Sequence, residues 1–249
     1  MLKRFALACA VALTLSVQAS PAVPMRDYLA VYQILPLKSD KPIGEYRISQ
    51  RWLPERLVYQ QRASINFSWQ ILLSTHQYHY RDEVLYGLDN SLSYHISENN
   101  DGKVRLVDGT LRPSDYAVTI DSQTDGHAQT IAVEKSAFDL SLFALRFPTP
   151  CTAEQIGSRP RVRWLIPVSG EVGISNSHYV GFGDLLLPNS TTPLKDLCQI
   201  VSTGNRKEMN RRAWINRDGY LVYEISADYR LRLVPEASRL PSNVQEKRP

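Results

Sequence analysis

Apolar and polar residues alternate with a period of two along most of this chain. From Leu57 to Leu73, eight of the nine odd positions are apolar and six of the eight even positions are polar. Successive side chains of a β-strand point to opposite faces of the sheet, whereas a helix repeats every 3.6 residues. The pattern therefore predicts strands with one buried face. Because seventeen residues exceed the usual strand length, we expect a bend or break near Gln61 or beyond Trp69.

The same alternation predicts strands through the rest of the chain. Between Leu221 and Leu233 the odd positions place apolar residues on one side of a C-terminal strand. Further strands are expected at residues 28–35, 43–52, 78–86, 91–97, 103–111, 115–121, 128–133 and 162–167. Glycine adopts positive φ at little cost, so four glycine turns indicate hairpins: Asn100-Asp101-Gly102, Asp108-Gly109, Asp125-Gly126 and Asp218-Gly219. These signals describe an antiparallel meander.

Three segments interrupt the alternation. Residues 136–146 place apolar side chains at helical spacing before Pro148, which predicts a short helix beside the sheet. Residues 148–161 and 181–207 are rich in proline, serine and threonine and are expected to be long connections. The predicted fold is mainly β: a single curled antiparallel sheet, forming a half-barrel or open barrel, with one short helix.

The N-terminus carries the three parts of a secretory signal peptide. Lys3 and Arg4 precede an uncharged run at residues 5–17, and Val17-Gln18-Ala19 forms a small-x-small exit. The run is too short to span a membrane, so we expect cleavage after Ala19, no membrane span afterwards and a periplasmic location. Lipid attachment at Cys9 is the alternative, although it would leave an apolar segment of only residues 5–8.

The predicted organisation is a signal peptide at residues 1–19, a single antiparallel β domain at 20–235 and a disordered tail at 236–249. Loss of Lys3 and Arg4 with the signal lowers the formal net charge from +4 to +2. The basic residues are mostly interspersed with acidic ones. This balance argues against nucleic acid as a partner.

Cys151 and Cys198 are the two cysteines that remain after cleavage. An exported chain meets an oxidising compartment, which favours a disulfide between them. Two free thiols and a catalytic thiol are the alternatives. A catalytic thiol needs a partner histidine, and neither cysteine has one in a recognisable local pattern.

The sequence contains no strong catalytic or cofactor motif. Gly-x-Ser-x-Gly, His-Glu-x-x-His, a glycine-rich phosphate loop and Cys-x-x-Cys are all missing from it. His76 and His79 lie three apart on a predicted strand and so point to opposite faces, which disfavours a shared metal ion. We therefore expect no cofactor and no metal, and no catalytic residue is assigned. Catalytic groups can still be gathered from distant loops, so His79, His95, His127 and His178 remain candidates for a hydrolase.

Aromatic residues gather in the predicted strands of the first half. A curled sheet that does not close fully would present such rings on its concave face to an elongated apolar or amphipathic ligand. The residues assigned to this ligand surface are Phe67, Trp69, Tyr78 and Tyr80. The alternative is that these rings are ordinary core, because aromatic residues are common on half-buried strands.

The order of landmarks resembles a family of exported bacterial proteins. Lys41-Pro42-Ile43-Gly44-Glu45-Tyr46 follows an early strand, Phe138 to Arg146 follows a long antiparallel section, and a closing strand comes after Asp218-Gly219. This arrangement resembles domain of unknown function 3108 and its relatives over residues 28–234, although residues 181–207 depart from it. The resemblance implies a periplasmic, mostly β protein with a curled antiparallel sheet, similar to envelope lipid-carrier half-barrels. It carries over no catalytic residues.

These observations favour a non-enzymatic periplasmic protein. It would bind a lipid-like or amphipathic envelope molecule on its concave face, or assist envelope assembly with a protein partner. The alternative is a periplasmic hydrolase that acts on envelope glycan or lipid with a loop-assembled site. A third reading is a structural interaction module, for which an unpaired sheet edge or an exposed apolar patch would be the sign.

Overall fold

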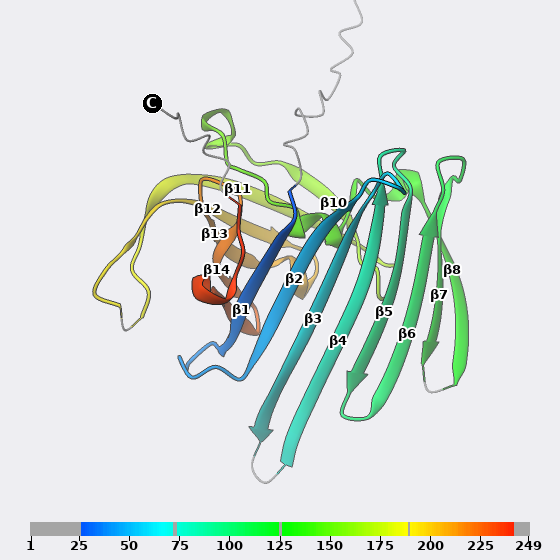
Figure 1. Cartoon of the computed structure of the whole chain (residues 1–249), viewed down its shortest axis with the longest axis horizontal. Helices are drawn as coiled ribbons and strands as arrows, with labels where there is room; N and C mark the ends of the chain where they lie inside the picture. Colours follow the sequence, from blue (N-terminus) through cyan, green and yellow to red (C-terminus); the bar gives the residue numbers. More distant parts are fainter. Residues whose placement is uncertain (1–25, 72–73, 125, 189, 242–249) are drawn as a thin grey trace, which may run out of the picture.

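The structure is a computed structural model that describes residues 26–71, 74–124, 126–188 and 190–241. The described residues form one sheet of fifteen strands (Figure 1). The first wall consists of β1 (Tyr28–Pro36), β2 (Gly44–Leu53), β3 (Val58–Ile71), β4 (Ser74–Gly87), β5 (Leu92–Asn100), β6 (Lys103–Leu111), β7 (Ala117–Thr124) and β8 (His127–Glu134). The second wall consists of β9 (Leu140–Ser141), β10 (Arg161–Leu165), β11 (Val172–Leu185), β12 (Leu194–Gly204), β13 (Arg211–Ile215), β14 (Leu221–Ser226) and β15 (Tyr229–Leu233).

The two walls join through the antiparallel pairing of β1 with β15, so the first and last strands meet in the middle of the sheet. The sheet ends at β8 on one side and at β9 on the other, and only residues 135–139 connect these edge strands along the chain. All ladders are antiparallel except the short parallel pair of β9 with β10. The predicted mainly β fold, an open and curled antiparallel sheet, is confirmed.

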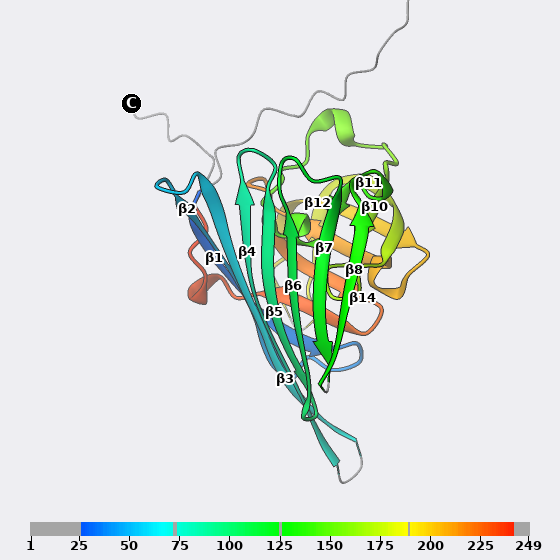
Figure 2. The same ribbon diagram turned by 90° about the vertical axis from the view of Figure 1, so that its right-hand side faces the viewer.

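The alternation read from the sequence places one row of side chains inside the curl. Ala63 on β3 pairs with Ile48 on β2 and with Asp82 on β4, and all three side chains are buried. β3 runs unbroken past Gln61 over fourteen residues and ends at Ile71, so the break falls beyond Trp69, the second of the two predicted places, and not near Gln61. β3 and β4 extend below their neighbours as a projecting hairpin, at the lower end of the molecule in Figures 1 and 2.

The upper part of the concave face is filled by core side chains. One cluster joins β4 to β8 with two residues from the second wall side, Phe143 and Leu165. Gly170, in the turn between β10 and β11, packs against Ile131 and Val133. The two edges of the sheet therefore meet through side-chain packing as well as through the chain.

The segment after β8 closes the upper end, but not as the predicted helix. It forms two separate 3₁₀ turns, η1 (Lys135–Ala137) and η2 (Leu142–Arg146), with β9 between them. Ser141 caps η2 by accepting a hydrogen bond from the backbone of Phe143. Beyond η2 the chain runs across to the β13–β14 turn, where Thr149 N donates to Gly219 O at 3.2 Å. The helix prediction is wrong because the same apolar spacing also fits a short 3₁₀ turn. Ser141 caps this turn at its start, and the chain after it is hydrogen-bonded to the β13–β14 turn.

Residues 181–207 form much of a long hairpin instead of a loop. β11 and β12 pair from Ser175 opposite Gly204 to Leu185 opposite Leu194, with two register shifts. The hairpin carries a disulfide between Cys151 and Cys198, which ties β12 to the segment before β10. The predicted disulfide is confirmed. The free-thiol and catalytic-thiol alternatives are wrong, because both sulfur atoms are bonded.

Three smaller predictions also differ from the structure. Asp108-Gly109 is not a turn: Gly109 lies within β6, where the ring of Tyr94 occupies the space of a side chain. Residues 221–233 form two strands, because the hydroxyl of Ser226 organises a turn before β15. Residues 236–241 belong to the fold, since Arg239 exchanges backbone hydrogen bonds with Leu29. The predicted signal peptide and residues 242–249 lie outside the described residues.

Candidate functional site

Four rings form a continuous aromatic strip on the inner face of the projecting β3–β4 hairpin. Phe67 lies opposite Tyr78, and Trp69 lies opposite His76. Ring centroids are 5.1 Å apart for Phe67 and Tyr78, 5.1 Å for Phe67 and Trp69, and 5.2 Å for the stacked pair of Trp69 and His76. All four side chains are only partly buried. We call these four residues the aromatic strip.

Polar neighbours hold both ends of the aromatic strip in place. His76 Nδ1 lies 2.7 Å from Asp101 Oδ2, and the other oxygen of Asp101 accepts from the backbone of Gln77 at 2.6 Å. That backbone hydrogen bond, followed by the bond to His76, lowers the pKa of Asp101. Tyr78 donates its hydroxyl to Glu98 at 3.0 Å. Burial, and then the charge of Glu98, raise the pKa of Tyr78, so the phenol stays neutral.

Three of the four residues predicted to line a ligand surface therefore lie together, and the fourth does not. Tyr80 is 8% exposed and belongs to the upper core. Its hydroxyl donates to Asp82 Oδ2 at 2.6 Å. Burial and then the charge of Asp82 raise the pKa of Tyr80 well above its usual value. His76, the fourth ring of the aromatic strip, was not among the residues assigned to the ligand surface from the sequence.

An ion pair occupies the interior above the aromatic strip. Arg146 of η2 donates to both oxygens of Asp82, with Nη1 2.7 Å from Oδ1. The Asp82 side chain is fully buried and that of Arg146 is 11% exposed. The guanidinium also lies 5.0 Å from the ring centroid of Phe143, and the Arg146 carbonyl accepts from Tyr28. This pair anchors the closing segment and fills space that a ligand entering from above would need.

One signal in the sequence marks half of this pair. Asp82 is a charged residue in an otherwise apolar and aromatic inner row of β4, and an inward carboxylate requires a partner. The partner lies 64 residues away in a segment expected to be helical. The alternation identifies the carboxylate, but it contains no information about which cation reaches it.

A second interior carboxylate lies on the other wall. Glu224 of β14 is 3.6 Å from Arg211 of β13. Burial raises the pKa of Glu224, and the positive charge of Arg211 opposes this effect only in part. The raised pKa means that the folded state favours the protonated acid. This stabilising contribution is fully present below the unfolded pKa and is lost as the pH rises through the folded pKa.

The stability of the Glu224→Gln variant relative to the wild type should therefore be higher at neutral pH than at acidic pH. As the pH rises from about 4 to about 7, the stability of the variant relative to the wild type should increase. The wild type loses stability as Glu224 ionises, whereas the amide of the variant cannot ionise. Urea denaturation at several pH values measures this difference. A difference that stays constant with pH would contradict the assignment.

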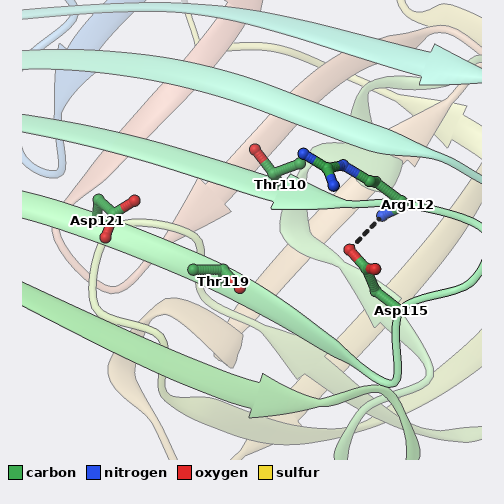
Figure 3. A pocket seen from close by; sticks show the side chains of 5 residues that line it. All are labelled: Thr110, Arg112, Asp115, Thr119 and Asp121. Atoms are coloured by element: carbon green, nitrogen blue, oxygen red, sulfur yellow. Dashed lines mark hydrogen bonds between the residues drawn. The ribbon is translucent and has the colours of Figure 1, made fainter.

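Two hollows lie among the described residues, one polar and one very small. The larger of the two hollows has a volume of about 280 Å³ and lies on the outer face at the upper end of β6 and β7 (Figure 3). Its lining is polar: Thr110, Arg112, Asp115, Thr119 and Asp121. The smaller, inside the barrel beside Trp164, Ser175 and Ser202, has about 10 Å³, the room of about one water molecule. Neither hollow suits an apolar ligand.

The histidines do not form a catalytic arrangement within the described part of the chain. His95 lies 2.8 Å from Asp108, but both side chains are exposed, at 55% and 64%, on the outer face. His79 contacts Asn66 at 2.9 Å, also on the exposed side of the hairpin. The described residues contain no group of three or more potential ligands that could hold a metal ion. They also contain no helix with the length and apolar character needed to cross a membrane.

No family model matches this chain, and no curated protein matches it. Among solved structures, the fold is similar to the crystal structure of a β-barrel-like protein of domain of unknown function DUF1849 from Brucella abortus. The TM-score is 0.59 and the identity 9%, over 84% of this chain and 96% of that chain. At this identity the similarity shows the fold alone. It supports a β-barrel-like fold and does not support domain of unknown function 3108 specifically.

Proposed function

We propose that this chain is an exported, non-enzymatic binding protein of the bacterial envelope. Its aromatic strip holds an amphipathic molecule at the lower end of the concave face. The observation that carries this proposal is the line of four partly exposed rings on a hairpin that projects beyond its neighbours. Single exposed apolar residues are common on proteins, whereas a contiguous exposed group indicates a binding surface.

The filled upper interior limits where such a ligand can lie. The ion pair of Asp82 with Arg146 and the core around Phe143 occupy the concave face above the strip. The ligand would therefore lie along the hairpin surface, with one side on the rings and the other in solvent. A molecule with one apolar and one polar side fits this position better than a purely apolar one, because Glu98 and Asp101 border the rings.

Truncation of the strip should weaken binding. We expect Trp69→Ala to lower affinity for phospholipid vesicles about tenfold or more, because a buried aromatic ring contributes about 1.5 to 3 kcal/mol. Vesicle co-sedimentation measures the affinity. Lipid extraction and mass spectrometry of the purified protein would identify a molecule that is already bound.

Trp52 provides the matched control. It packs on Tyr59 with ring centroids 4.5 Å apart, is also partly buried, and lies at the opposite end of β2 and β3. Trp52→Ala should leave vesicle affinity unchanged. Equal losses for the two variants, or no binding by the wild type together with an empty lipid extract, would overturn the proposal.

A further inference from the structure

We propose that two copies of this chain pair through the free edge of β8 and form an antiparallel, two-fold symmetric dimer. β8 is the last strand of the sheet, and among the described strands it is hydrogen-bonded to β7 alone (Figure 2). It is eight residues long. A strand with one unpaired side presents a row of N–H and C=O groups that can pair with another strand.

The pairing with β7 fixes which backbone groups are free. Lys135 N donates to Tyr116 O at 2.7 Å, next to the register pair of Ala117 and Glu134. Bonded pairs in an antiparallel ladder recur at every second residue, so the odd positions of β8 face β7. The even positions therefore direct their N–H and C=O groups away from the sheet. These positions are Ala128, Thr130, Ala132 and Glu134, and the side chains of all four are exposed.

The edge lacks the devices that usually prevent strand pairing. Proteins protect free edges with proline, bulges, lysine or short strands. β8 contains no proline or lysine, pairs with β7 without a register shift, and has small side chains at three of its four outward positions. Such an edge is expected to be covered in the assembled protein.

The opposite edge of the sheet identifies the partner as β8 itself. β9 has only two residues, so a head-to-tail contact between β8 and β9 could form very few bonds. An extended peptide is the other option, but strand addition gains specificity from pockets for alternate side chains. Three of the four residues of β7 opposite the outward positions are polar, Thr119, Asp121 and Gln123, and the fourth is the small Ala117. A second β8 supplies equal length and gives a closed interface in which the same residues meet.

Ile131 is the residue on the two-fold axis in the register that uses all four outward positions. In that register Ala128 lies opposite the partner's Glu134, and Thr130 lies opposite the partner's Ala132. The two glutamates are kept apart, and Ile131, whose half-buried side chain lies on the inner face beside Gly170, has its backbone next to that of its symmetry mate. Moving the axis to Thr130 or Ala132 would leave outward groups unpaired.

Removal of one outward N–H group tests the interface. The mature wild type should show a rise in mass toward the dimer with increasing concentration over about 1 to 200 µM in analytical ultracentrifugation. Ala132→Pro should remain monomeric over that range and should keep the thermal midpoint that the wild type shows at low concentration, where it is monomeric, because this N–H does not bond to β7. Ala132→Ser keeps the N–H and should dimerise like the wild type.

A cross-link tests the register. Residues on the axis form a non-bonded pair with Cα atoms about 4.5 Å apart, which suits a disulfide. Ile131→Cys should therefore form a covalent dimer under oxidising conditions. Gln129→Cys should not, because four residues of strand separate it from its symmetry mate, about 13 Å. A monomeric wild type at every concentration, a dimer that survives Ala132→Pro, or no cross-link through Ile131→Cys would each overturn the proposal.

The dimer and the aromatic strip are independent of each other. Trp69→Ala should leave the concentration dependence of the mass unchanged, because the strip lies on the β3–β4 hairpin and not at β8. A loss of dimer in this variant would count against the β8 interface.

Discussion

Replacing Asp82 with asparagine is expected to lower the free energy of unfolding by about 3 to 5 kcal/mol. The variant leaves Arg146 charged, largely buried and without its carboxylate. It also weakens two further hydrogen bonds, because Asp82 accepts from the hydroxyl of Tyr80 and from the backbone N–H of Ala63. Urea denaturation followed by fluorescence measures the change.

Glu83 provides the control for this variant. It is the next residue on β4, points to the other face and pairs with Arg62, with side chains 41% and 61% exposed. An exposed ion pair contributes at most about 1 kcal/mol, so Glu83→Gln should have little effect. Similar losses for Asp82→Asn and Glu83→Gln would contradict the assigned difference in burial.

A double variant separates the loss of the pair from the burial of a lone charge. Replacing a whole buried ion pair with apolar residues is often neutral or stabilising, whereas removal of one partner is costly. Asp82→Leu combined with Arg146→Met should therefore be more stable than Asp82→Asn alone. A double variant less stable than the single one would indicate that the pair orients η2 in a way that packing cannot replace.

The sequence predicted local pairing well where the turn chemistry is strong. Asp101 and Gly102 both have positive φ, and they join β5 to β6 where a hairpin was expected. The alternation in β3 and β4 correctly placed the aromatic side chains on one face. Both signals depend on neighbours in the sequence, so no knowledge of distant contacts was needed.

The failures concern distant contacts. Asp108-Gly109 resembles a turn in the sequence. Glycine is needed there because the ring of Tyr94, on the neighbouring strand β5, occupies the space that a side chain would fill. β11 and β12 contain glycine, serine and polar residues, and their pairing with each other outweighs weak individual propensities. Arg146 and Asp82 are 64 residues apart in the sequence, and only the curl of the folded sheet brings them together. Composition and spacing along the chain do not specify such contacts.

The same arrangement explains why the candidate site lies at one end of the sheet. The closing segment that contains Arg146 covers the upper end, and the core around Phe143 fills the space beneath it. β3 and β4 extend beyond the neighbouring strands at the lower end, so the rings on their inner face are only partly buried. Exposure of the aromatic strip follows from strand length, because the inner row continues where β2 and β5 end.

Loss of the disulfide is the second large effect that we expect. The Cys151–Cys198 bridge closes a loop with a sequence separation of 47 residues. The chain-entropy estimate for a loop of this size is about 4 kcal/mol of stability, which arises mainly in the unfolded state. Cys151→Ala should therefore lower the free energy of unfolding by about that amount in urea denaturation. It should also speed proteolysis after Arg159, because the segment beside it is no longer tied to β12.

Reduction of the wild type provides the control, because it breaks the same bond without a change in side-chain volume. In the presence of dithiothreitol the wild type should lose stability toward that of Cys151→Ala, and the variant should not respond. A variant as stable as the oxidised wild type would show that the bridge contributes nothing beyond the packing of β11 and β12. If dithiothreitol still lowered the stability of Cys151→Ala, the effect of the reductant would have to arise from a source other than the bridge.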